Sequence, residues 1–294
     1  MVDALRTSDD RFQKLHCWAY APSYFQRADG LRLHYVDIGP RQAAKTWLCL
    51  HGQPTWSYLY RRMMPLFASA GHRVVAPDFP GFGRSDKPID ETTYTFDFHR
   101  DALLELIEAL DLSNIVLVVQ DWGGLIGLTL PMAAPQRFTS LLMMNTMLGT
   151  GDRPLGDGFF AWRDFSNRNP DMDIAKLMQR ACPHIAPEEA AGYAAPYPDA
   201  SYKAGVRRFP NLVPDGLDAP GGALAREARA FWHGGWSGRS LMAIGMKDPV
   251  LGPTVMRALH GIIRNCPAPM EIADGGHFLQ EWGAPIARVA VRSL

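Results

Sequence analysis

The chain has 294 residues, of which 47% are hydrophobic and 20% charged, a composition typical of a folded globular protein. Thirty Lys and Arg balance thirty Asp and Glu, which argues against nucleic acid or an anionic membrane as a partner. Four scattered cysteines without a Cys-x-x-Cys pair argue against a disulfide framework and a zinc site. The chain begins with polar residues, and no apolar run approaches the roughly 20 residues of a membrane helix, so we expect no signal peptide and a cytoplasmic protein.

The first half of the chain alternates between predicted strands and helices. Residues 31–37 alternate apolar and polar side chains after the turn pair Asp29-Gly30, which indicates an antiparallel outer strand. Short apolar runs at 46–50, 73–77 and 140–145 predict further strands, and residues 95–110 predict a helix with Thr95 as its N-cap. This alternation is typical of an α/β fold with a doubly wound, mostly parallel sheet.

Residues 115–128 form the most informative stretch. The apolar run from Ile115 to Val119 indicates a strand buried on both faces, and Asp121, Trp122 and a glycine pair separate it from an apolar helix. Strand, sharp turn and helix are the context of a nucleophile elbow, in which one side chain projects above the carboxyl edge of the sheet. An aspartate at the apex can displace a leaving group and form an ester. The alternative is that Asp121 merely caps the following helix.

The composition changes after Met147. Residues 149–214 are rich in Pro, Gly and aromatic residues, with short helical pieces and no convincing strand. We therefore expect them to form a helical cap inserted into a core domain of residues 1–148 and 215–294. Strand patterns return at residues 240–245 and 270–273.

Ligands of open α/β sheets bind beyond the carboxyl ends of the strands. Asp121, Asp248 and His277 each follow a predicted strand, in the order nucleophile, acid and histidine. His51-Gly52-Gln53-Pro54 follows the strand at 46–50, which makes the backbone N–H groups of Gln53 and Trp122 candidates for an oxyanion hole.

These motifs resemble those of the haloalkane dehalogenases, a family of the α/β-hydrolase superfamily, over nearly the whole chain. The core segments that carry the resemblance are residues 51–59, 77–83, 119–124, 242–248 and 271–278. In the lid, residues 157–162 and 193–198 are similar to the branch of the family whose second halide-binding tryptophan comes from the cap.

The resemblance implies hydrolysis of haloalkanes to a primary alcohol, a halide and a proton, with water as co-substrate and no metal or cofactor. Asp121 would attack the halogen-bearing carbon to give an alkyl ester, while the indole N–H groups of Trp122 and Trp162 hold the departing halide. The resemblance also implies that His277, oriented by Asp248, activates the water that attacks this ester.

The resemblance further gives the N–H groups of Gln53 and Trp122 the task of holding the oxyanion formed in that attack. Phe159 and Leu125 are tentative pocket residues. Phe159 either lines the pocket or packs the lid, and Leu125 stands where an aromatic residue would make the pocket smaller. Trp232 and Trp236 are expected to pack in the interior.

Two other functions remain open at this point. An epoxide hydrolase would use the same Asp-His-Asp set but would activate the epoxide oxygen with lid tyrosines, for which Tyr193, Tyr197 and Tyr202 are candidates. A non-catalytic ligand-binding protein of the same fold is the other alternative. We expect a monomer in each case.

Overall fold

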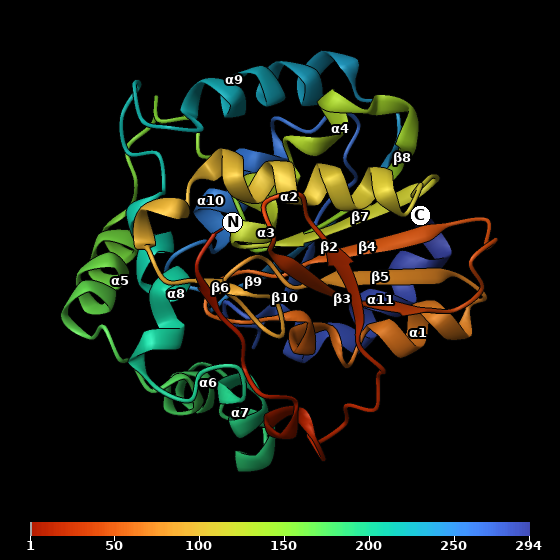
Figure 1. Ribbon diagram of the computed structural model, residues 1–294. Helices are drawn as coiled ribbons and strands as arrows, with labels where there is room; N and C mark the ends of the chain where they lie inside the picture. The colour runs from red at the N-terminus through yellow and green to blue at the C-terminus, as the bar shows by residue number, and fades with distance from the viewer. Residues whose placement is uncertain (1) are drawn as a thin grey trace.

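The computed structural model describes residues 2–294 and contains one central sheet of eight strands. The strands lie in the spatial order β10-β9-β8-β7-β4-β5-β3-β2 (Figure 1). In chain order they are β2 (Ser23–Gln26), β3 (Arg32–Ile38), β4 (Thr46–Leu50), β5 (Arg73–Pro77), β7 (Ile115–Gln120), β8 (Phe138–Met144), β9 (Arg239–Gly245) and β10 (Met270–Ile272). Two short strands, β1 (Ala4–Leu5) and β6 (Lys87–Pro88), pair separately.

The six strands from β10 to β5 are all parallel, as the alternation of strands and helices predicts. Every residue of β4, β5 and β7 is buried, which explains why these strands have continuous apolar sequences rather than alternating ones. Parallel strands end at the same edge of the sheet, so the loops after β4, β7, β9 and β10 come together there.

The prediction of an antiparallel outer strand at residues 31–37 is only partly right. β3 is antiparallel to β5, as expected, but it is not the outermost strand. The edge is formed by β2, which pairs with β3 from Ser23 opposite Tyr35 to Gln26 opposite Arg32. β2 is only four residues long and has no clear alternation, so its sequence does not reveal it.

Helices cover both faces of the sheet: α2 lies on one face, and α1 and α11 on the other (Figure 1). The predicted helix at 95–110 is α2, and the hydroxyl of Thr95 caps it by accepting the Phe98 N–H at 3.1 Å. The helices of the core are α1 (Met64–Ser69), α2 (Phe96–Ala109), α3 (Trp122–Gly127), α4 (Leu130–Ala133), α9 (Gly222–Ala230), α10 (Pro253–His260) and α11 (Gly283–Ser293).

Residues 149–214, which follow β8, contain a group of helices on one side of the molecule, drawn in green and teal in Figure 1. They are α5 (Asp157–Arg168), α6 (Ile174–Ala181), α7 (Pro187–Ala194) and α8 (Ala204–Arg208). Residues 149–214 contain no strand, as predicted, and lie within the described part of the chain. The exact boundaries of a cap domain stay a prediction. Within residues 2–294, no helix is long and apolar enough to cross a bilayer.

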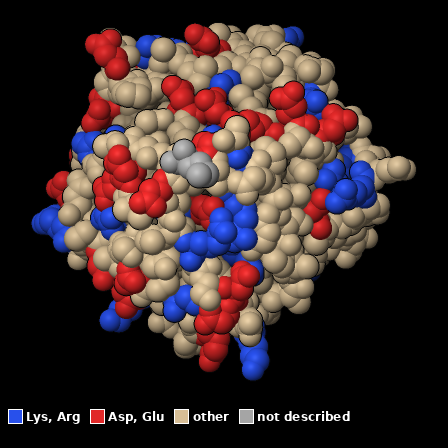
Figure 2. All heavy atoms as spheres, in the orientation of Figure 1, with Lys and Arg blue, Asp and Glu red and all other residues tan. Residues whose placement is uncertain are grey.

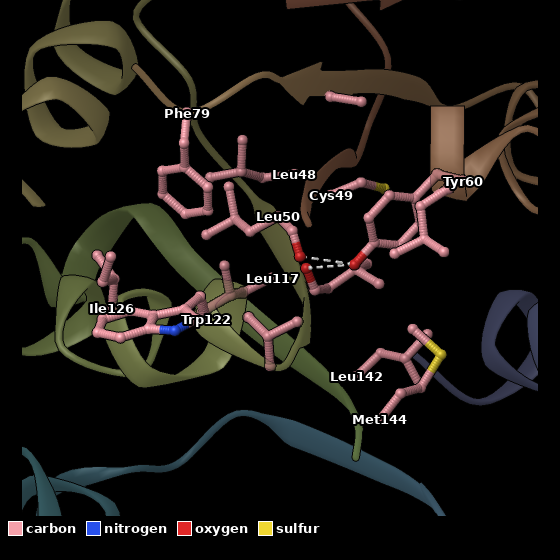
Figure 3. Close-up of a cluster of buried hydrophobic side chains, with 14 of the residues drawn as sticks. Leu48, Cys49, Leu50, Tyr60, Phe79, Leu117, Trp122, Ile126, Leu142 and Met144 are labelled. Carbon is pink, nitrogen blue, oxygen red and sulfur yellow. Dashed lines mark hydrogen bonds between the residues drawn. The ribbon is translucent and has the colours of Figure 1, made fainter. Parts of the chain in front are cut away.

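The core continues directly into the carboxyl edge of the sheet. Figure 3 shows Leu50, Phe79, Leu117 and Trp122 packed in one buried cluster, with the Tyr60 hydroxyl donating to the Leu50 carbonyl at 2.8 Å. The face shown in Figure 2 carries acidic and basic side chains interspersed, in keeping with the balanced composition.

Candidate active site

Asp121 lies at the apex of a sharp turn between β7 and α3. Its backbone has φ 50° and ψ −126°, a conformation that non-glycine residues rarely adopt. The glycines after it are required by close packing, since a Cβ on Gly123 would lie 2.1 Å from the Leu50 carbonyl oxygen, and one on Gly124 would lie 1.9 Å from Thr146 Oγ1. The Asp121 side chain caps nothing in α3, so the capping alternative is wrong.

His277 lies between two carboxylates. Its Nε2 is 3.5 Å from Asp121 Oδ2, and its Nδ1 is 2.9 Å from Asp248 Oδ2. Burial alone would lower the pKa of His277, but the charges and hydrogen bonds of Asp248 and Asp121 outweigh it and raise the pKa to about 10. His277 is therefore an imidazolium at neutral pH as long as both carboxylates are ionised.

Asp248 is held in a ready-made carboxylate site. Its Oδ1 accepts the N–H groups of Val250 and Leu251 at 2.8 and 3.1 Å, and its Oδ2 accepts Asn145 Nδ2 at 2.8 Å. Burial pushes the pKa of Asp248 up, but the charge and hydrogen bonds of His277 and the amide donors hold it below the usual value. Asp248 is thus an ionised partner that fixes the histidine ring.

The loop after β4 brings a backbone donor to the Asp121 carboxylate. The Gln53 N–H donates to Asp121 Oδ1 at 2.8 Å. Gly52 makes this approach possible, because a Cβ there would lie 2.2 Å from the same oxygen. The Gln53 side chain turns away and donates to the Val206 carbonyl at 3.0 Å. The N–H of Trp122, the first residue of α3, has no acceptor within its own helix and lies next to the nucleophile.

A cavity of about 500 Å³ opens in front of Asp121, between the core and the inserted helices. Both candidate halide-binding residues, Trp122 and Trp162, line it, as do the tentative pocket residues Phe159 and Leu125. Trp122 is packed from behind by the Phe209 ring, whose centroid is 4.5 Å away. The cavity wall is mainly apolar, and its other charged members are Arg180, Lys247 and Asp274.

The remaining polar aromatic residues are engaged elsewhere. Trp232 and Trp236 are buried, as expected, and their indole N–H groups donate to the Leu128 carbonyl and Ser240 Oγ. The Tyr193 hydroxyl is bound to Glu281, and that of Tyr197 donates to the Pro54 carbonyl at 3.3 Å. Over residues 2–294, no tyrosine lines the cavity, so the structure offers no pair of hydroxyls for an epoxide oxygen.

One cluster of potential metal ligands occurs in the described residues, namely His16, Cys17 and Glu189. None of the three lines the cavity, and Glu189 is already paired with Arg61 and Arg62. Two arginines next to the carboxylate disfavour a cation, so this cluster adds nothing to the active site.

Sequence reasoning missed two polar residues of the site. Asn145 follows β8 and bridges Asp248 to the Gly245 N–H, which donates to its Oδ1 at 2.7 Å. Gln120, the last residue of β7, is fully buried against His277. Both lie at carboxyl ends of strands, which is the signal that could have found them.

Comparison with known proteins agrees with this geometry. The family model described as the alpha/beta hydrolase fold matches residues 46–284, which makes the chain a member of this class. The haloalkane dehalogenase of Psychrobacter cryohalolentis is 42% identical over 99% of this chain and 97% of its own, and haloalkane dehalogenase 1 of Mycobacterium bovis is 40% identical over 95% and 94%. A solved haloalkane dehalogenase, DpaA from Paraglaciecola agarilytica NO2, described as tetrameric, is 47% identical with a TM-score of 0.97, covering 100% of this chain and 99% of that one.

Within the α/β hydrolases, the chain belongs to the haloalkane dehalogenases, which act on carbon–halide bonds.

Proposed function

We propose that this protein hydrolyses haloalkanes through an alkyl ester on Asp121. The ionised carboxylate attacks the halogen-bearing carbon in line, the carbon–halogen bond breaks, and the halide leaves with the bonding electron pair. The observation that carries the proposal is a histidine between two carboxylates beside a mainly apolar cavity, whose wall includes Trp122 and Trp162 but no tyrosine of residues 2–294.

The halide leaves between Trp122 and Trp162, whose indoles can only donate hydrogen bonds. Neutral donors in a dry pocket stabilise the negative charge that develops on the halogen, without holding the product as tightly as a cation would. Trp162 lies on α5, so this proposal places the chain in the branch of the family that takes its second halide-binding tryptophan from the cap. Residues 149–214 then act as the cap that completes the site.

The second step hydrolyses the ester. Once Asp121 is alkylated it is neutral, so His277 loses one of the two charges that keep it protonated and releases its proton to solvent. The neutral imidazole then removes a proton from water, the water oxygen attacks the ester carbonyl, and Asp248 stabilises the imidazolium that forms. The Gln53 N–H already reaches Asp121 Oδ1 and, with that of Trp122, supports the resulting oxyanion. Collapse of the oxyanion breaks the bond between the carboxyl carbon and the alkyl oxygen, which takes the second proton of the water and leaves as the primary alcohol, and Asp121 is restored as a carboxylate. The products of the whole cycle are the alcohol, the halide and one proton.

The test is halide release from a short terminal bromoalkane, with diol formation from styrene oxide measured in parallel. We expect bromide and alcohol in equal amounts, abolished by Asp121→Ala. Diol without bromide would instead support an epoxide hydrolase. Neither product from a folded protein would support a ligand-binding protein that lacks catalysis.

The oligomeric state is a separate proposal. We infer a monomer from the absence of any contrary feature in the sequence, whereas the similar enzyme from Paraglaciecola agarilytica is described as tetrameric. Light scattering after gel filtration separates the two, since a chain mass of 32.6 kDa and four times that mass elute far apart.

A further inference from the structure

Gln120 contacts the proposed base at two points. Its Nε2 is 3.2 Å from His277 Nε2 and 3.1 Å from the His277 carbonyl oxygen. The residue is completely buried at the end of β7, 157 positions away from His277 in the sequence. Gln120 is thus a buried polar neighbour of the triad to which the proposed mechanism gives no role.

The His277 carbonyl fixes which way the Gln120 amide faces. A carbonyl oxygen only accepts hydrogen bonds, so the amide must present its NH₂ group to it and not its Oε1. The same nitrogen lies 3.2 Å from His277 Nε2, to which it can donate only when that nitrogen carries no proton, as in the neutral ring that the second step needs, with the ring proton on Nδ1 donated to Asp248. In this orientation Gln120 Oε1 is buried and has no hydrogen-bond partner among residues 2–294, a cost that argues for a role in the site and not in stability.

We propose that Gln120 is a positioning residue of the second step: its amide selects the His277 tautomer that takes a proton from water, and it anchors the His277 backbone. The contact to Nε2, at 3.2 Å, is at the long end of the hydrogen-bond range, so the attacking water can replace it. This inference rests on the function proposed above.

The charged groups around His277 determine in which state of the enzyme Gln120 affects its protonation. Asp121 and Asp248 both favour the imidazolium, whereas the Gln120 donor favours the neutral ring. Esterification neutralises Asp121, so the amide has its largest effect on the ester intermediate. The more distant charged groups are Arg180, Lys247 and Asp274 in the cavity wall, of which Lys247 and Asp274 are paired with each other, and Glu281, which is paired with Arg61.

The experiment compares Gln120→Met with Gln280→Met. Both replace a fully buried glutamine near the triad, but no hydrogen bond joins Gln280 to His277 among residues 2–294. Single-turnover reactions with a short terminal bromoalkane are followed by bromide release and by the mass of the alkylated protein, over a range of pH.

For Gln120→Met we expect a bromide burst close to that of the wild type and accumulation of the ester. In the plot of the ester-hydrolysis rate against pH, the rising limb should move to higher pH by about one unit. At pH values below the midpoint of that limb, hydrolysis should therefore be about tenfold slower than in the wild type. Gln120→Glu keeps the shape, replaces the donor by a carboxylate, and should move the limb further up; it serves as the second variant if Gln120→Met does not fold. Gln280→Met should leave the limb where it is.

Ester hydrolysis in Gln120→Met with the same rate and pH profile as in Gln280→Met would overturn the proposal. An equal loss in the rates of the bromide burst and of ester hydrolysis would also overturn the proposal, because it would show that Gln120 only supports the structure of the turn at Asp121. Failure of the underlying mechanism looks different, since the wild type itself would then give no burst and no alkylated protein.

Discussion

The charge of Asp121 should control the protonation of His277, and Asp121→Asn isolates that control. The substitution removes the charge, as alkylation does, but keeps an oxygen that can accept the Gln53 N–H. We expect the pKa of His277 to fall from about 10 in the wild type toward neutrality, although Asp248 is still in place.

The size of the shift follows from the geometry. Two unit charges 3.5 Å apart, the distance between His277 Nε2 and Asp121 Oδ2, interact by about 5 kcal/mol at an effective dielectric constant of about 20. Both charges are delocalised, and each side chain keeps some contact with solvent, which reduces this value by roughly half. Since one pKa unit corresponds to about 1.4 kcal/mol, we expect a fall of about 2 units.

The assay is a pH titration of the histidine ring nitrogens by NMR in the wild type and in Asp121→Asn. Asp274→Asn is the matched control, because it removes a carboxylate from the same cavity wall that is exposed and paired with Lys247. The control should change the pKa of His277 by less than about 0.3 units. An Asp121→Asn titration that coincides with the wild type would refute the idea that alkylation switches His277 from acid to base.

Three further outcomes are expected. His277→Gln should release one equivalent of halide and then stall as the ester, since alkylation needs no base; turnover at the wild-type rate would contradict the role of the histidine. Trp162→Phe removes one donor and should weaken chloride binding by about tenfold, measured by quenching of tryptophan fluorescence, and an unchanged affinity would exclude this residue from the halide site. Gly52→Ala should lower kcat at least about 100-fold, because its methyl group would overlap the nucleophile, whereas Gly156→Ala, which meets no atom within 4 Å, should keep full activity in the same halide-release assay.

Much of the fold could be predicted because buried parallel strands have continuous apolar sequences. β4, β5 and β7 show this pattern, and the structure has them at or within one residue of the predicted positions. β2 and α11 were missed for different reasons. A four-residue edge strand is held by its neighbour β3 and needs no pattern of its own, and α11 starts with Gly283-Ala284-Pro285, which conceals the helix that follows.

The part of the candidate site that could be predicted consists of residues that directly follow parallel strands. Asp121, Asp248 and His277 each follow a strand, so the shared edge of a parallel sheet brings them together. The contacts of Asn145 and Gln120 depend instead on which way a side chain points from a strand end, and on a partner more than 100 residues away. The order of residues along the chain does not show side-chain directions or distant partners.

A buried cluster of charges holds helices α6 and α7 in place beside the candidate site. Arg61 of the core is fully buried and pairs with Glu281 at 2.6 Å and with Glu189 of α7 at 2.8 Å. The Tyr193 hydroxyl of α7 also binds Glu281, which lies four residues after His277. Removing one partner of a buried ion pair leaves an uncompensated charge and is strongly destabilising, so the cluster favours the arrangement in which these side chains meet. The same cluster therefore fixes α7 and the loop that carries His277. α6 packs against α7 and supplies part of the cavity wall, so the cluster aligns that wall with His277.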